Sequence, residues 1–152
     1  MRNKAIKSQL LLLCQESLDV RLKTVTAIIN DLQLSLQSET KSSAGDKHET
    51  GRAMVQLERE KAGNQLAEIQ KIQTTLSKIN ADHTAKSIGL GSIVFTTKAN
   101  YFIAISSGEI TIENEKFYAI SPNTPIGLLL LGKTVGDVVS FRGNSFNIVE
   151  VI

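Results

Sequence analysis

The sequence predicts an α+β fold, in which an N-terminal antiparallel two-helix coiled coil precedes a small antiparallel β-sheet domain with one short helix. Apolar residues repeat at helical spacing through the first eighty residues, which contain no Phe, Tyr, Trp or Pro. All five Phe, both Tyr and both Pro lie at or after position 95, where β-branched residues are also frequent. We therefore divide the 152 residues into a helical hairpin at 1–80, a linker at 81–87 and a sheet domain at 88–152.

An apolar stripe predicts the first long helix. Its members are spaced three or four apart, as on one face of a helix that packs against a partner: Leu11, Cys14, Leu18, Leu22, Val25, Ile29, Leu32 and Leu36. The stripe stops after Leu36, and the polar segment 37–45 predicts a turn. Cys14 is the only cysteine, so no intrachain disulfide can form, and its place on the stripe predicts a small buried side chain.

A second, weaker stripe predicts the returning helix. It consists of Val55, Ala62, Leu66, Ile69, Ile72, Leu76 and Ile79. Because the connection is short, the two helices must run antiparallel. Two helices of about thirty residues would form a rod roughly 45 Å long at about 1.5 Å per residue. The second helix is mostly polar near the turn, so we expect the helices to be held together chiefly at the other end.

Short runs of β-branched and aromatic residues predict the sheet. The first four strands are expected to form an antiparallel meander and the last two a hairpin: 91–96, 101–105, 109–112, 116–120, 135–141 and 146–151. Segment 124–132 predicts a short helix, with Thr124 as its cap, Pro125 at its first position and Gly132 at its end.

Composition excludes several classes of function. The formal net charge is +2, with twelve basic against nine acidic residues in 1–80 and five against six in 81–152, too small a bias to indicate nucleic-acid binding. His48 and His83 have no partners at metal-ligand spacing, and no nucleophile elbow or phosphate loop is present. The apolar run 10–13 is too short to span a membrane. We therefore expect a cytoplasmic protein without an active site of its own.

Two acids three residues apart, Asp46 and Glu49, lie in the predicted turn. One interpretation is structural, because Asp46 or Ser43 can cap the second helix and Glu49 then occupies the partner position of a capping box. The other is functional, because two carboxylates one helical turn apart can share a hard cation such as Mg²⁺. Two protein ligands make only part of a magnesium site, so another macromolecule would have to supply the rest.

The sequence resembles a known family at several points. The turn Ser43-Ala44-Gly45-Asp46-Lys47-His48-Glu49 resembles the Gly-Asp-x-x-Glu-Asn tip of the Gre transcript-cleavage factors of bacterial RNA polymerase. The C-terminal half is more similar, through Gly91-Ser92-x-Val94, the segment Ile-Ser-Pro-Asn-Thr-Pro-Ile-Gly at 120–127, and Leu-Leu-Gly-Lys-x-Val-Gly-Asp at 130–137. The order of parts agrees as well, and the likeness covers nearly the whole chain.

The resemblance implies an elongation factor with an FKBP-like C-terminal domain that docks on RNA polymerase, while the hairpin enters the secondary channel. Asp46 and Glu49 match the two family acids that help to hold a second Mg²⁺ and a water, so that the polymerase cuts its own backtracked RNA. Asn123, Thr124 and Pro125 match the docking loop. The implied protein is a monomer, not itself an enzyme, and contacts the nascent RNA only indirectly.

The sequence departs from the family pattern beside the second acid. Where the family usually has Asn-Ala-Glu-Tyr, this chain has Thr50-Gly51-Arg52-Ala53, and it has Asn123 where an acid is common in the docking loop. Two alternatives therefore stand beside a cleavage factor. One is a non-catalytic regulator that competes for the secondary channel, and the other is a coiled-coil interaction protein unrelated to transcription.

Overall fold

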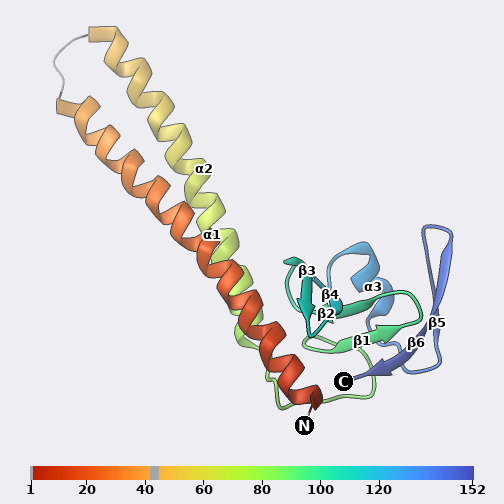
Figure 1. Ribbon diagram of the computed structural model, residues 1–152. Coiled ribbons are helices and arrows are strands. Elements are labelled where there is room, and N and C mark those ends of the chain that lie inside the picture. The colour runs from red at the N-terminus through yellow and green to blue at the C-terminus, as the bar shows by residue number, and fades with distance from the viewer. Residues whose placement is uncertain (1, 42–44) are drawn as a thin grey trace. The chain divides into compact units, whose positions relative to one another are not determined.

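The computed structural model describes residues 2–41 and 45–152, with side chains described for 3–38 and 50–152 (Figure 1). Packing divides the chain into two compact units. We call Met1–Ser17 together with Thr74–Ile152 the sheet unit, and Leu18–Gln73 the hairpin unit. The predicted α+β class is confirmed, since two long helices precede six strands and one short helix.

The two long helices are α1 (Arg2–Lys41) and α2 (Gly45–Ser77), and each contributes to both units. Figure 1 shows them side by side in the hairpin unit. The predicted turn at 37–45 is wrong for residues 37–41, which continue α1. The reason is local, because this polar stretch contains no Gly or Pro and includes good helix formers such as Gln37, Glu39 and Lys41. Helix propensity therefore extends α1 beyond its last apolar stripe residue.

Burial within the hairpin unit decreases toward the connection. Val25 and Ile29 of α1 are buried, as are Ala62 and Ile69 of α2. Beyond these positions the stripe residues whose side chains are described are only half-buried: Leu32, Leu36 and Val55. This gradient follows the weakening apolar pattern of the sequence, because few apolar side chains are left there to pack against each other.

A six-stranded sheet forms most of the sheet unit, in the order β3-β4-β2-β1-β6-β5. The strands are β1 (Ile93–Thr96), β2 (Asn100–Ile103), β3 (Gly108–Ile112), β4 (Glu115–Ile120), β5 (Val138–Phe141) and β6 (Asn144–Val151). The short helix α3 (Pro125–Leu130) lies between β4 and β5 in the sequence. Each of these elements overlaps a predicted one.

The predicted antiparallel meander is wrong at one place. Strand β2 pairs with β4 rather than β3, and this pairing is parallel, with Tyr101 opposite Tyr118, so the sheet is mixed. Burial explains the order. Strand β4 buries Phe117 and Ala119, whereas β3 is largely exposed. A solvated strand suits the edge of a sheet, and the more apolar strand takes the inner position.

Two tight turns set the register of the hairpins. Glu113 and Asn114 connect β3 to β4 with φ of 50° and 67°, and Arg142 and Gly143 connect β5 to β6 with φ of 52° and 80°. Positive φ at both central residues is the geometry of two-residue turns whose twist matches that of the paired strands. The predicted hairpin around 142–145 is therefore confirmed.

One buried cluster of the sheet unit joins Leu130 of α3 to the strands. Its members are Ile88, Val94, Ile103, Leu130, Val139, Phe146 and Ile148. The beginning of α1 belongs to the same unit and buries Ile6, Leu10 and Cys14. Packing thus groups both helix ends with the sheet, whereas the sequence divides the chain at 81–87, a segment without helix or strand.

Candidate functional site

The two acids singled out in the sequence lie at the beginning of α2. This helix starts at Gly45, which places Asp46 and Glu49 within its first turns. Their side chains lie outside the described residues, and so does Ser43, the other candidate cap. The capping and the metal-binding interpretations of these residues therefore both stay predictions.

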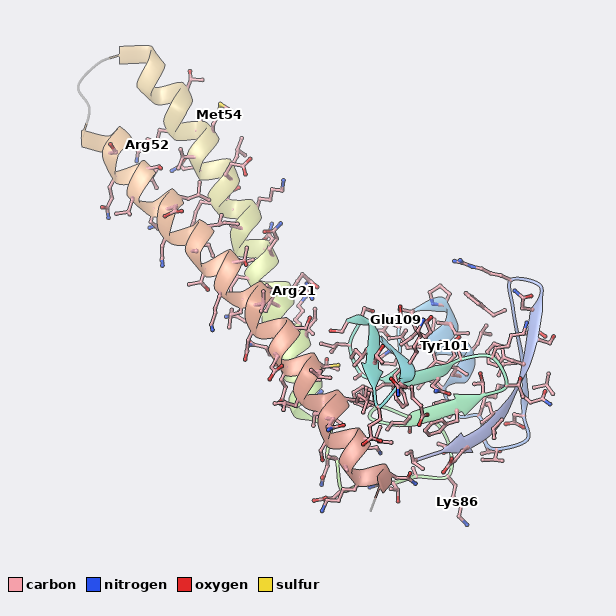
Figure 2. All side chains as sticks on the ribbon, in the orientation of Figure 1. Arg21, Arg52, Met54, Lys86, Tyr101 and Glu109 are labelled. Carbon is pink, nitrogen blue, oxygen red and sulfur yellow. The ribbon has the colours of Figure 1, made fainter. Side chains whose placement is uncertain are left out.

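The next turns of α2 present exposed side chains. Thr50 and Arg52 are exposed, and so are the apolar side chains of Met54 and Leu57. Figure 2 shows Arg52 and Met54 on this part of α2. Packing therefore does not dictate which residues occupy these positions, and they are accessible to a partner molecule.

One polar contact links the two helices in this region. The Arg59 Nε of α2 donates a hydrogen bond to the Gln33 Oε1 of α1 at 3.3 Å. The contact is exposed, so water competes for both groups and the bond contributes little to stability. This hydrogen bond joins α1 and α2 on the side of the buried residues Ile29 and Ala62 that faces the connection.

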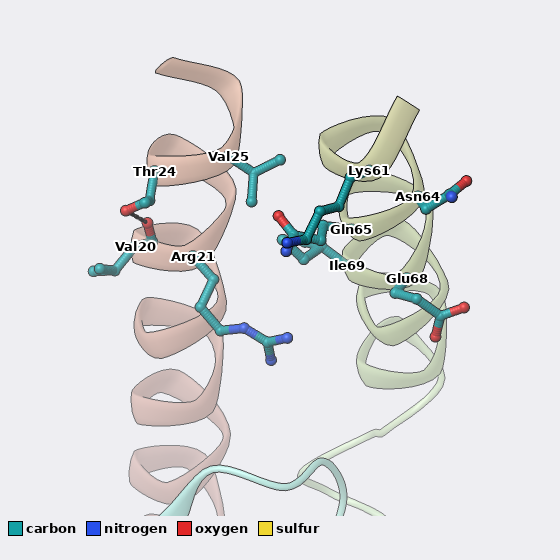
Figure 3. A pocket seen from close by; sticks show the side chains of 9 residues that line it. All are labelled: Val20, Arg21, Thr24, Val25, Lys61, Asn64, Gln65, Glu68 and Ile69. Carbon is teal, nitrogen blue, oxygen red and sulfur yellow. Dashed lines mark hydrogen bonds between the residues drawn. The ribbon is translucent and has the colours of Figure 1, made fainter. Parts of the chain in front are cut away.

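A groove of about 580 Å³ lies between the helices in the hairpin unit, nearer to its Leu18 and Gln73 boundaries than to the connection (Figure 3). Apolar Val25 and Ile69 line it together with longer polar side chains, and the Arg21 side chain extends from α1 toward α2. The Thr24 hydroxyl is engaged within α1, because it donates to the Val20 carbonyl at 3.0 Å. Polar side chains thus occupy space that apolar residues fill in a tightly packed helix pair.

The predicted docking loop is held by its own hydrogen bonds. Thr124 is the N-cap of α3, as predicted, and its Oγ1 accepts from the Gly127 N–H at 3.1 Å and donates to the Ser121 carbonyl at 2.7 Å. The Asn123 N–H donates to the Ser121 Oγ at 3.2 Å. Thr124 therefore has a structural role, while the side chains of Asn123 and Pro125 are exposed to solvent.

Gly127 allows this loop to close. A Cβ at this position would lie 2.4 Å from the Ser121 carbonyl oxygen and 2.8 Å from the Thr124 Oγ1. Real side chains do not approach a backbone oxygen so closely, so any other residue would push the cap apart. Steric exclusion thus explains why glycine occupies position 127 in the Pro-Ile-Gly sequence at 125–127.

The prediction of a short helix at 124–132 did not include an exposed apolar surface, which the structure shows at α3. Of the four leucines at 128–131, only Leu130 is buried, whereas Leu128 is 60% exposed and Leu129 and Leu131 are exposed as well. We call Pro125, Leu128, Leu129 and Leu131 the α3 patch. The signal was present in the sequence, because a helix of two turns cannot direct four consecutive leucines into one core.

Other predicted features can be compared with the structure directly. Cys14 is buried as expected, and burial raises the pKa of its thiol to about 11. Among the described residues, no group of three or more His, Cys, Asp or Glu could hold a metal ion. Within the same part of the chain, none of the helices combines the length and the apolar character needed to cross a bilayer.

Comparison with known proteins gives a weak likeness only. No family model matches the chain, and no curated protein matches it. Among solved structures the chain is similar to the transcription factor Gfh1, at 20% sequence identity and a TM-score of 0.34. That match covers 98% of this chain and 92% of the other. Similarity at this level does not establish a family.

Proposed function

We propose that this protein is a Gre-like transcription elongation factor, which inserts the tip of its helical hairpin into the secondary channel of RNA polymerase. There it promotes Mg²⁺-dependent cleavage of backtracked RNA by the polymerase, without being an enzyme itself. One observation carries the proposal. The Gly-Asp-x-x-Glu sequence at 45–49 begins α2 directly after the connection from α1, the position of the tip motif in Gre factors.

The chemistry of the two acids supports this role. Mg²⁺ prefers oxygen ligands and retains several waters, so Asp46 and Glu49 would supply part of its shell and the polymerase the remainder. When bound in this way, the metal can activate water and stabilise a leaving oxygen. The acids themselves would orient the shared ion and accept hydrogen bonds from its waters. Contact with the nascent RNA would be indirect, through the polymerase, and one monomer would suffice.

The α3 patch supports docking on a protein. Apolar side chains gathered beside a rigid loop are typical of interaction sites. The loop that holds Asn123 and Pro125 is fixed by the hydrogen bonds of Thr124 and Ser121, so little ordering would be needed on binding. We therefore assign polymerase docking to the α3 patch together with Asn123.

The role of the acids can be tested by replacing Asp46 and Glu49 with Ala. Stimulated cleavage in a backtracked complex should fall to the level of polymerase alone, while affinity for the polymerase stays within a few-fold of wild type. The matched control replaces Glu58 and Glu60 with Ala, which removes the same charge from exposed positions farther along α2. Cleavage by the double Asp46, Glu49 variant at the wild-type rate would show that the assigned role is wrong.

The docking assignment has a separate test. Leu128→Ser should weaken binding to the polymerase about tenfold, since a fully desolvated leucine contributes on the order of 1.5–3 kcal/mol. Val149→Ser is the control, because Val149 is similarly exposed but lies on β6 outside the α3 patch. Equal affinities of wild type and the Leu128→Ser variant would refute docking through this patch.

A second candidate, a secondary-channel regulator without cleavage activity, is favoured by Arg52. This exposed cation lies three residues after Glu49, where the family usually has an acid, and a positive charge there opposes binding of a divalent cation. Arg52→Glu should then increase cleavage. Shortening of backtracked RNA by the wild-type protein would exclude this candidate. Failure to recover the polymerase core in a pull-down would instead favour an interaction protein outside transcription.

A further inference from the structure

Two buried polar side chains meet at one pocket of the sheet unit. Among the residues whose side chains are described, the buried polar or charged ones are Lys7, 3% exposed, and Ser92, 5% exposed. Both line the same pocket of about 300 Å³. The remaining lining residues are Lys78, Asn80, His83, Ala85 and 89–91. Burial of polar groups is therefore concentrated here rather than scattered through the core.

Lys7 brings a positive charge that the pocket does not balance. Its Nζ donates one hydrogen bond, to the His83 carbonyl at 2.8 Å, although an ammonium group has three donors. None of the described residues that line the pocket is an acid, and Asp82, beside His83 in the sequence, pairs with Lys4 at 2.7 Å. Burial lowers the pKa of Lys7, as expected for a charge without a partner of opposite sign. Buried charges in proteins are normally paired, so this part of the pocket favours an anion.

Ser92 brings a hydrogen-bond donor. Its Oγ accepts the Gly89 N–H at 3.0 Å, and its backbone N–H donates to the Gly89 carbonyl at 3.1 Å, so the loop is fixed. Among the described residues, none accepts a hydrogen bond from the Ser92 hydroxyl. A Cβ at Gly89 would meet no atom within 4 Å, which leaves open space beside this loop.

We propose that this pocket binds a phosphate group, either as free phosphate or as part of a small phosphorylated molecule. The ammonium of Lys7 and the hydroxyl of Ser92 would donate to its oxygens, and the exposed Lys78 would close the rim. Two lysines match the roughly 1.5 to 2 negative charges of phosphate near neutral pH, whereas a carboxylate carries only one. The volume is near the lower end for small-molecule sites, so the ligand is small.

The wild-type chain gives the first test. Inorganic phosphate, ribose 5-phosphate and acetate are titrated separately at constant ionic strength, and backbone amide resonances are followed by NMR. Saturable shifts centred on 89–92 are expected with both phosphates but not with acetate. Tighter binding of ribose 5-phosphate would identify a phosphorylated molecule as the ligand, and tighter binding of inorganic phosphate would identify the free ion. Absence of saturable shifts with both would overturn the proposal.

Variants then locate the site. Lys7→Met keeps the apolar stem and removes the charge, so the phosphate Kd should rise at least about tenfold. Lys4→Met removes the same charge from the same helix at an exposed position outside the pocket, and its Kd should stay within twofold of wild type. Ser92→Ala should raise the Kd several-fold and serves as the second variant if Lys7→Met does not fold. Equal Kd values for wild type and the pocket variants would overturn the proposal and leave Lys7 as a tether of the His83 carbonyl.

Discussion

The sheet unit and the hairpin unit differ in how deeply they bury their side chains. The sheet unit encloses Phe102, Phe117 and Ile93 completely. Among the described residues of the hairpin unit, the buried ones are aliphatic side chains on the facing sides of α1 and α2. A thick core supplies stability in proportion to the apolar area that it removes from water. This difference teaches that the sheet unit supplies most of the free energy of unfolding. The described side chains near the connection of the hairpin are only weakly constrained by packing.

The largest effect should come from the centre of the sheet unit. Phe102→Ala should lower the free energy of unfolding by about 3–5 kcal/mol, because it removes a fully buried ring and leaves a cavity. Urea unfolding followed by circular dichroism measures the change. The exposed Val149→Ala is the control, with an expected change within about 0.5 kcal/mol. A loss below about 1 kcal/mol for Phe102→Ala would contradict the assignment of stability to this core.

Gly127→Ala should cost up to about 3 kcal/mol, since the added methyl group would collide with the Ser121 carbonyl and the Thr124 hydroxyl. Under the proposed function, binding to the polymerase should weaken as well, because the loop at 121–124 loses its cap. Gly132→Ala is unsuitable as a control, because Gly132 has a φ of 81° and alanine would strain the backbone there. The control is Thr124→Ala, which removes the cap without a collision and should cost about 1 kcal/mol. An unchanged stability of the Gly127 variant would contradict the steric argument.

Alkaline pH should weaken the sheet unit through Cys14. Burial raises the pKa of this thiol from 9.0 to about 11, so the fold favours the neutral form. This stabilisation is complete below pH 9 and is lost as the pH rises through 11, by about 3 kcal/mol in all. Thermal unfolding between pH 8 and 11 measures it, with Cys14→Ala as the reference because it cannot titrate. Parallel pH profiles of the two proteins would contradict the burial of the thiol.

A matched pair of conservative changes compares the two cores directly. Ile103→Val in the sheet unit should cost about 1.5 kcal/mol and Ile29→Val in the hairpin unit about 0.5 kcal/mol, the two ends of the usual range. The reason is that Ile103 is enclosed on all sides, whereas Ile29 has solvent nearby into which the helices can relax. Chemical denaturation of both variants tests the ranking, and the reverse order would break the comparison.

The smallest effect on stability should come from the acids. Replacing Asp46 and Glu49 by Ala should change the free energy of unfolding by less than about 0.5 kcal/mol if they act in the polymerase. A capping box would instead lose on the order of 1 kcal/mol. Hydrogen exchange of the α2 amides separates these outcomes, because loss of a cap should increase exchange in the first turns of the helix.

Local pattern predicted the elements of the fold but not their arrangement. Heptad spacing located α1 and α2, and turn-forming pairs such as Arg142 and Gly143 located a hairpin. The inner position of β4 could not be read from the sequence, because strand order depends on how whole faces compete for burial. The end of α1 was missed since its last residues have no apolar signal and follow helix propensity instead.

The candidate sites show the same limit. The acids and the docking loop were found through short motifs, whose residues are neighbours in the sequence. The pocket of Lys7 was missed because its parts are distant in the sequence, since Lys7 and the His83 carbonyl that it contacts are 76 positions apart. The only sequence signal was that Lys7 lies four residues before Leu11 and seven before Cys14, on the apolar stripe, and this spacing does not reveal the partner.

The hairpin unit begins at Leu18 and ends at Gln73, so both of its boundaries fall inside the long helices α1 and α2. Heptads could be added or deleted in pairs, one from each helix, without rebuilding the globular part. The entropy of closing such an excursion increases only slowly with its length. The length of the hairpin unit can thus change by seven residues per helix at little entropic cost.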